Sequence, residues 1–420
     1  MNPFYEPARP ADQLYVNWQE IYPKSYCKEE VDPYTKVRII LMNGTEFEAV
    51  WFSHQFHRHC ANNDIRRALA VTRRVEQQQQ KHIACLKPIN ESILEHTIGY
   101  EQLAVDLTAI LAQRDPDPYA VDVYNLALLE DFDHLYRYAD LLDLEKRVHA
   151  EKLVGCYTEI MPGRPTISEH RNPHDSVRYY CDFSKADLLT KIDSMIITAA
   201  EQQTMNYYMN QCAFYESDLG RKLYQEIAMI EEQHVTQYGS LIDPTMSWLE
   251  NLLMHEYVEC YLYYSCLNDE VDCYVKKIWE HHFEQELSHL HLAVALLKKY
   301  EGKEWQQVIP DGEFPELIRF TPQKEYIRKV LRETVTNTAL RENPQFPVNK
   351  LPQNADFFNY QNTVNPNVNI VPSHNVINCI IKEFGEDYRY EIAPSPIPSL
   401  RDRTHDNTQL GRVPMSNRYI

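Results

Sequence analysis

The chain has 420 residues, of which 61 are acidic and 42 basic, so its formal charge is −19 at neutral pH. This acidity argues against nucleic acid or an anionic membrane as a partner, because both attract basic surfaces. Only 10 glycines stand beside 29 tyrosines, which favours long regular elements over loops. The first residues lack a basic stretch followed by an apolar one, and no apolar run approaches about 18 residues. We therefore expect a cytoplasmic protein without a membrane span.

The first sixty residues are predicted to form an extended arm followed by a β-hairpin. Residues 1–36 are rich in proline and tyrosine, which is typical of a segment that wraps a surface. Two apolar runs, 37–42 and 45–52, flank Asn43-Gly44. Asn-Gly between apolar runs indicates a hairpin, because both central residues of a tight two-residue turn need positive φ.

Residues 61–301 have a helical pattern and are predicted to form one helical domain. Each segment is bounded by Pro, Gly, Asn or Asp. The expected helices are 62–87, 91–113, 119–155, 184–213, 218–241, 245–267 and 270–300. Residues 156–183 form a long irregular connection. Residues 302–420 are predicted to be a Pro/Asn-rich extension in which 376–381 and 388–392 could form a second hairpin.

A glutamate, a second carboxylate thirty residues later and a histidine three residues after that recur three times along the chain. On a helix, positions i and i+3 share a face, so each carboxylate and histidine can offer an oxygen and a nitrogen to one metal ion. Two facing sets would hold two ions. The sets are Glu101 with Asp131 and His134, Glu201 with Glu231 and His234, and Glu256 with Glu286 and His289.

The spacing of each set fits two antiparallel helices joined by a tight turn, because residues equally far from such a turn lie at the same height. The midpoint of the first set is Pro116, inside an Asp-Pro-Asp-Pro helix break. The midpoint of the second set is Glu216, beside the helix-capping residue Ser217. The midpoint of the third set is Val271, close to an Asn-Asp pair.

This arrangement resembles the ferritin-like superfamily of di-iron and di-manganese carboxylate proteins, which use Glu and Glu-x-x-His from paired helices. The superfamily includes rubrerythrins, manganese catalases and di-iron oxygenases. The resemblance covers roughly residues 91–300. It implies a mainly α fold, a ferritin-like antiparallel helical bundle with additional helices and small terminal β-hairpins. It also implies a cofactor of two Fe ions, or alternatively Mn.

Three sets are one too many for a single bundle of this kind. In the ferritin-like fold the second and third helices run parallel, which requires a long connection between the two hairpins. The irregular residues 156–183 separate the first set from the second, whereas the short turn at 242–244 joins the second to the third. We therefore favour the first two sets as ligands. The third set remains the alternative, and Glu259 could substitute for Glu256 in it.

Tyr138 and Tyr238 each follow a histidine of the favoured sets by four residues and are candidate catalytic residues for proton or electron transfer. Tyrosine at this spacing is more commonly a core residue. The expected function is a dinuclear-metal oxidoreductase that activates O2 or peroxide. Its electrons would come from a separate reductase or ferredoxin, because the chain has no flavin, nicotinamide or iron–sulfur signature. The alternatives are a metal-handling or peroxide-scavenging protein without an organic substrate, and a metal-free structural helical protein. A homo-oligomer is left open.

Overall fold

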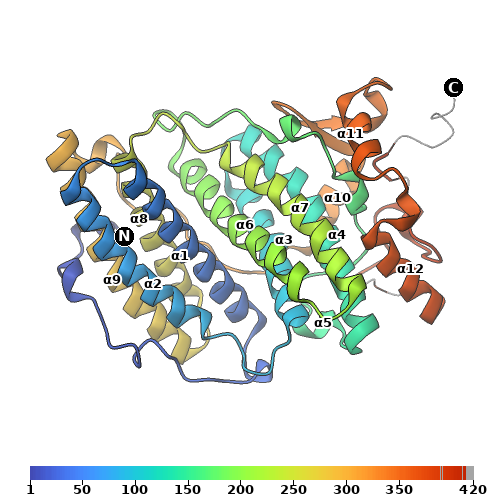
Figure 1. The fold of residues 1–420 in the computed structure, drawn as a ribbon, viewed down its shortest axis with the longest axis horizontal. Coiled ribbons are helices and arrows are strands. Elements are labelled where there is room, and N and C mark those ends of the chain that lie inside the picture. The colour runs from blue at the N-terminus through green and yellow to red at the C-terminus, as the bar shows by residue number, and fades with distance from the viewer. Residues whose placement is uncertain (388, 390, 409, 413–420) are drawn as a thin grey trace. The chain divides into compact units, whose positions relative to one another are not determined.

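The computed structural model describes residues 1–387, 389, 391–408 and 410–412. Over these residues the chain forms twelve α-helices and one two-stranded antiparallel hairpin (Figure 1). The mainly α fold expected from the sequence is confirmed. No helix of the described residues combines the length and apolar character that a membrane crossing requires.

Contacts divide the chain into two units, each assembled from separate stretches of sequence. The first unit contains residues 1–91, 181–203 and 242–320, and the second contains 92–180, 204–241 and 321–420. The three consecutive regions expected from the sequence differ from this division. The first unit therefore combines residues from the beginning, the middle and the later part of the sequence, and so does the second.

Four helices form the bundle of the first unit. Helices α1 and α2 pack as one hairpin, α8 and α9 as another, and α1 contacts α8 while α2 contacts α9. Each helix begins after a side chain that accepts hydrogen bonds from its first turn, an arrangement that stabilises helix N-termini. The helices are α1 (Pro33–His59), α2 (Asn63–Ala84), α8 (Trp248–Asp269) and α9 (Cys273–Glu301).

The prediction of a β-hairpin at residues 37–52 is wrong, because these residues lie inside α1. The apolar run 37–42 is buried by helix packing in the first unit. A side-chain carbon at Gly44 would lie 2.9 Å from Nε2 of Gln203 on helix α6 (Leu188–Phe214). The same Nε2 donates a hydrogen bond to the Ile40 carbonyl at 2.9 Å, and Asn43 donates to the Gln203 amide oxygen. Asn43-Gly44 thus permits a close helix approach instead of a turn.

A buried carboxylate, Glu270, joins three helices of the first unit. It follows α8 directly and accepts hydrogen bonds from Arg38 and Thr35 of α1 and from Trp279 of α9. The Arg38 Nε to Glu270 Oε2 distance is 2.9 Å, and the Arg38 side chain is only 2% exposed. Because buried charges require partners, this ion pair stabilises the positions of α1, α8 and α9 together.

The second unit is built around α3, α4 and α7, with the last part of α6 and several shorter helices. Helix α4 packs against α3, α7, α10 and α12, and α12 also packs against α7. The helices are α3 (Ile93–Arg114), α4 (Pro118–Lys146), α5 (Ala150–Leu153), α7 (Asp218–Gly239), α10 (Lys324–Thr334), α11 (Asp356–Val364) and α12 (Pro372–Phe384).

The hairpin of the second unit lies at a place that the sequence did not indicate. Strands β1 (Asn337–Leu340) and β2 (Asn343–Pro347) pair antiparallel, with Thr338 opposite Phe346. Of the second expected hairpin, residues 376–381 instead belong to α12, which begins at a proline and is capped by Gly385 with φ of 87°. Within its other strand, residues 388 and 390 lie outside the described part of the chain.

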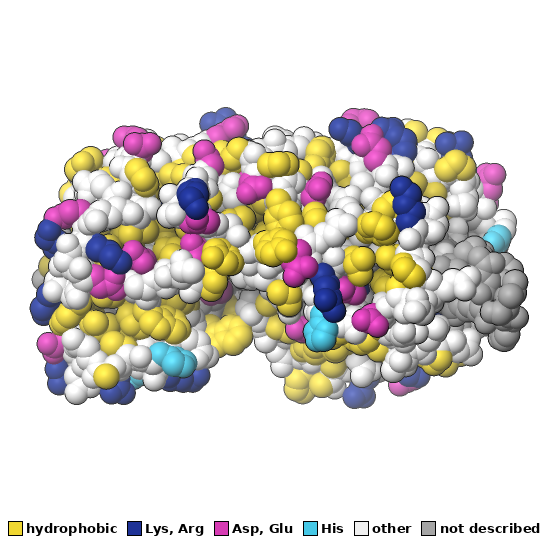
Figure 2. All heavy atoms as spheres, turned by 90° about the horizontal axis from the view of Figure 1, so that it is seen from above, with side chains coloured by type: hydrophobic (Ala, Val, Ile, Leu, Met, Phe, Trp, Pro, Cys, Tyr) yellow, Lys and Arg dark blue, Asp and Glu magenta, His cyan; other side chains and the backbone are white. Residues whose placement is uncertain are grey.

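The seven helices expected between residues 62 and 300 are confirmed, and most of their ends agree within a few residues. Helix α4 is the exception, because it ends at Lys146 and not near residue 155. Arg147 adopts a left-handed conformation with φ of 57° and caps this helix. On the face shown in Figure 2, acidic and basic side chains are scattered among the others and do not gather by sign.

Candidate metal centre

Five of the favoured ligands meet in the core of the second unit. Glu101 comes from α3, Asp131 and His134 from α4, and Glu231 and His234 from α7. Each of these side chains is at most 1% exposed. Buried carboxylates and imidazoles are uncommon in a helical core unless they bind a partner or a metal ion.

The break between α3 and α4 lies where the sequence predicted it. Helix α3 ends at Arg114 and α4 starts at Pro118, after Asp117 has capped its first turn. The first and second carboxylates of the set are equally far from this break. At about 1.5 Å per residue, each lies roughly 20 Å from the turn and therefore halfway along the hairpin.

Glu231 is the centre of the cluster, because each of its oxygens faces a different histidine. Nδ1 of His134 lies 3.0 Å from Glu231 Oε1, and Nδ1 of His234 lies 3.1 Å from Oε2. Nδ1 of His234 is also 3.2 Å from an Asp131 oxygen. Ligand atoms of Glu101, His134 and Glu231 lie within 4.8 Å of one another. The nitrogen and oxygen donors of three helices thus converge on one small volume.

Burial and mutual charge shift the pKa values of this cluster in opposite directions. Burial raises the pKa of Glu101 well above its usual range, and the neighbouring Glu231 and Asp131 charges raise it further. Burial opposes ionisation of Glu231 as well, but His134 and His234 outweigh it and lower its pKa to about 2. A bound cation would favour the charged form of Glu101 and so oppose this rise in its pKa.

An outer ion pair fixes the orientation of His234. Its Nε2 lies 2.5 Å from Glu130 Oε2, and Glu130 is held by Arg171 at 2.6 Å. Arg171, which also hydrogen-bonds Gln237 of α7, lies in the irregular connection after α5. A metal-binding histidine almost always gives its second nitrogen to such a partner, which leaves the first nitrogen for the metal. Sequence reasoning missed both Glu130 and Arg171, since no spacing rule links a loop arginine to a helix carboxylate.

Among the tyrosines, Tyr208 makes the direct contact with the cluster, and the sequence did not single it out. Its hydroxyl donates to Glu101 Oε1 at 2.5 Å. Tyr138, a predicted catalytic residue, is fully buried, and its hydroxyl has no hydrogen-bond partner among the described residues. Its ring lies 5.3 Å from the Tyr208 ring and 4.9 Å from that of Tyr224. The Tyr238 ring lies 6.1 Å from the His234 ring and packs against Tyr124.

Replacing Tyr208 with phenylalanine is expected to weaken metal binding by about 10- to 100-fold, because the Glu101 carboxylate loses the donor that orients it. Tyr138→Phe is the matched control, since it removes a hydroxyl that has no partner in the described structure and should leave metal affinity unchanged. Competition of each variant with a chelator for Mn2+ would measure the difference. Equal affinities of the two variants would show that the Tyr208 hydrogen bond does not support the ligands.

Glu201 lies on α6, in the stretch that groups with the first unit, and is 1% exposed. Tyr208 follows it by seven residues on the same helix. Residues seven apart lie nearly two turns apart on one helix face, so Glu201 lies on the face that also presents Tyr208. Its role as a ligand stays a prediction.

The third predicted set lies in the first unit. Glu256 is on α8, and Glu286 and His289 are on α9. Nδ1 of His289 lies 3.1 Å from Glu286 Oε2 and 3.9 Å from Glu256 Oε2. Ligand atoms of Glu76, Glu256 and His289 come within 4.8 Å of one another. The three sets therefore do not compete for a single bundle, because the first unit gathers the third set with residues of α2.

No protein-family model, curated protein or solved structure matches this chain.

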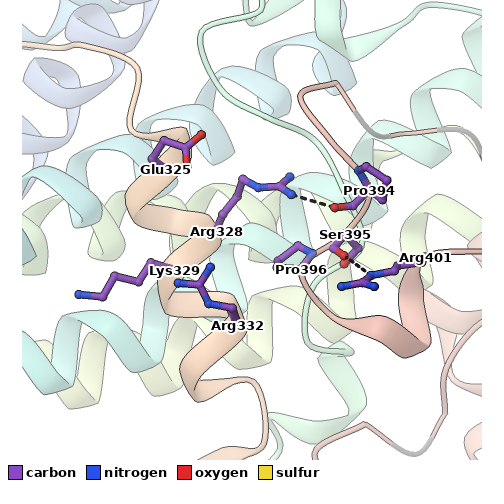
Figure 3. A pocket seen from close by; sticks show the side chains of 8 residues that line it. All are labelled: Glu325, Arg328, Lys329, Arg332, Pro394, Ser395, Pro396 and Arg401. Atoms are coloured by element: carbon purple, nitrogen blue, oxygen red, sulfur yellow. Dashed lines mark hydrogen bonds between the residues drawn. The ribbon is translucent and has the colours of Figure 1, made fainter.

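A pocket of 650 Å³ on the second unit has a positive lining (Figure 3). Arg328 donates to the Pro394 carbonyl at 2.8 Å, and Arg401 donates to the Ser395 carbonyl at 3.1 Å. A basic pocket in an acidic chain attracts anions. None of the predicted metal ligands lines it. The lining residues are Glu325, Arg328, Lys329, Arg332, Pro394, Ser395, Pro396 and Arg401.

Proposed function

We propose that the second unit holds a dinuclear iron centre, with manganese as the alternative metal, and that the protein is an oxidoreductase that activates O2 or peroxide. The proposal depends above all on Glu231, whose two oxygens face the Nδ1 atoms of His134 and His234 at 3.0 and 3.1 Å. Imidazole and carboxylate together suit iron and manganese. A ferritin-like relationship, which rests on the motif alone, is part of this proposal.

The ligands that would hold the ions are Glu101, Asp131, His134, Glu231 and His234, together with Glu201. We include Glu201 by analogy with Glu256, the residue at the same place in the third set. Ligand atoms of Glu256 come close to those of His289 and of Glu76 on α2. A reduced metal pair supplies two electrons to O2 or peroxide when it is bound.

The surrounding residues would control protons and exclude water. Glu130 and Arg171 hold His234 in the orientation that directs Nδ1 inward. The Tyr208 hydroxyl donates a hydrogen bond to Glu101. The buried Tyr138 hydroxyl has no hydrogen-bond partner among the described residues, and the Tyr138 ring packs against the Tyr208 ring. Burial raises the pKa of Tyr208 well above its usual range, so this residue keeps its proton at neutral pH. An external reductase or ferredoxin would return the electrons.

A second candidate function is metal handling or peroxide scavenging without an organic substrate. The observation that favours it is the burial of the ligands, each of which is at most 1% exposed. An oxidant as small as O2 or peroxide can reach such a site through small fluctuations, whereas a larger substrate needs an open cavity.

The reaction of the reduced, iron-loaded protein with O2 tests the proposal. Stopped-flow mixing should show oxidation of Fe(II) with an absorbance change that is absent from the His134→Ala/His234→Ala variant. If Tyr238 takes part, Tyr238→Phe should change the decay of that absorbance without lowering the iron content. A fully metallated, reduced protein that is inert to both O2 and peroxide would contradict the oxidoreductase and favour a storage or structural role.

A further inference from the structure

A second cluster of buried acidic side chains lies in the core of the first unit, and it includes Glu46, Glu76 and Glu259, which are outside the sequence motif. It combines five carboxylates with one imidazole, and every member is at most 2% exposed. All four helices of the bundle contribute. The members are Glu46 of α1, Glu76 of α2, Glu256 and Glu259 of α8, and Glu286 and His289 of α9.

The cluster contains two groups of converging donor atoms that share Glu256. In one group, ligand atoms of Glu76, Glu256 and His289 lie within 4.8 Å of one another. In the other group, ligand atoms of Glu256, Glu259 and Glu286 also lie within 4.8 Å of one another. The first group contains one nitrogen donor, whereas the second group consists of oxygen donors alone.

The α1–α2 hairpin repeats the spacing of the recognised sets with one substitution. Glu76 follows Glu46 by thirty residues, and Gln79 stands three residues later, where the other sets have histidine. The Gln79 amide donates to Glu286 Oε1, just as His134 faces Oε1 of Glu231.

The two clusters correspond in their surroundings as well. The intervals from Glu46 to Glu101 and from Glu201 to Glu256 are both 55 residues. Tyr263 follows Glu256 by seven residues and donates to Glu46, as Tyr208 does to Glu101 in the second unit. This agreement in register shows that the first unit places its carboxylates where the second places its candidate ligands.

Glu259 has no equivalent in the other sets, and its buried carboxylate makes no hydrogen bond within the described part of the chain. The residue is 2% exposed. Nε2 of His289 also has no hydrogen-bond partner there. Among the described residues, no lysine or arginine forms an ion pair with any member of the cluster. An unpaired buried carboxylate is costly, and a bound cation removes that cost.

We propose that the first unit holds a second, independent metal centre. Glu76, Glu256 and His289 bind one divalent ion, and Glu256, Glu259 and Glu286 bind another. The second position takes an ion that prefers oxygen ligands, such as Mn2+, because carboxylates alone surround it. Glu46 and Gln79 lie beside these positions, where Tyr263 and Glu286 orient them through hydrogen bonds. The centre goes beyond the proposed function, since it needs none of the ligands in the second unit.

Manganese binding by the full-length His134→Ala/His234→Ala variant tests the proposal, because that variant lacks both histidines of the metal centre proposed for the second unit. After anaerobic incubation with Mn2+ alone, elemental analysis should find about two ions per chain. Their electron paramagnetic resonance spectrum should show magnetic coupling, which requires that two ions lie close together. Adding Glu259→Gln should remove about one ion and abolish the coupling, since the all-oxygen position loses a charged ligand of unchanged size.

Glu284→Gln is the matched control, because Glu284 is an exposed acidic residue of α9 outside the cluster. It should leave both ions and their coupling intact. Circular dichroism of each variant would confirm that the helices are present. A folded double-histidine variant without bound Mn2+ would overturn the proposal, and so would equal Mn2+ contents in the Glu259→Gln and Glu284→Gln variants.

Discussion

Replacing His234 with alanine should remove about two metal ions per chain from the iron-loaded protein, the full content of the proposed centre. His234 faces both Asp131 and Glu231, so its loss removes an imidazole nitrogen from Asp131 and leaves Glu231 with His134 alone. Glu130→Gln should have a smaller effect, about a 10- to 100-fold loss of affinity, because Glu130 acts only through the orientation of His234. Elemental analysis after anaerobic Fe(II) loading, followed by titration with a chelator, would separate the two effects.

The control for this series is His149→Ala in the same unit. His149 is half exposed and lies 3.1 Å from Asp143, away from the candidate ligands. Its removal should not change the iron content. If His234→Ala and His149→Ala retained equal amounts of iron, the metal centre proposed for the second unit would be wrong.

Replacing Arg38 with methionine should destabilise the first unit by about 3–5 kcal/mol, the usual cost of removing one partner of a buried ion pair. Glu270 would remain buried without the guanidinium that now binds both of its oxygens. Arg67→Met is the matched control, because the Arg67 side chain is 76% exposed and pairs with Asp64 at the surface. It should change stability by less than about 1 kcal/mol. Chemical denaturation measures both variants, and equal effects would contradict a stabilising role for the buried pair.

The same pair predicts how stability depends on pH. Burial opposes ionisation of Glu270, but Arg38 outweighs it and holds the pKa of this carboxyl below its usual value. A lowered pKa contributes stability that is complete above the unfolded-state pKa, about 4.3, and is lost as the pH falls through the folded-state pKa. The difference in unfolding free energy between the wild type and Glu270→Gln should therefore narrow as the pH falls below about 4. A difference that grew towards acid pH would contradict this assignment.

Local sequence signals were sufficient for the helices between residues 62 and 301. Ser92, Asp117, Ser217 and Asp272 are short polar residues that cap the helices they precede, and each capping bond is local. The thirty-residue spacing also predicted which residues share a height on each hairpin. Local signals failed for α1, because its Asn43-Gly44 reflects a contact with Gln203, 160 residues away in the sequence.

That error also concealed the fourth set of carboxylates. Predicted strands at residues 37–52 place Glu46 outside any helical hairpin. The recurring motif also contains histidine, whereas α2 carries Gln79 at that position. Glu46 and Glu76 share with the other sets only the thirty-residue spacing of two carboxylates. By contrast, no pattern could have indicated Arg171, because an irregular segment brings it to Glu130.

The interleaved composition of the two units affects the order in which they can form during synthesis. In the sequence, the pairs α1–α2 and α8–α9 of the first unit lie on either side of α3, α4 and α7 of the second unit. The α1–α2 hairpin ends at Ala84, whereas its partner hairpin is complete only at Glu301. It must therefore await that partner while roughly 220 further residues leave the ribosome, at a rate of about 5–20 residues per second. During those seconds its apolar and acidic faces are uncovered. Helices α3 and α4 can pack on each other earlier, because no residues of the first unit interrupt the stretch 92–180 that contains them.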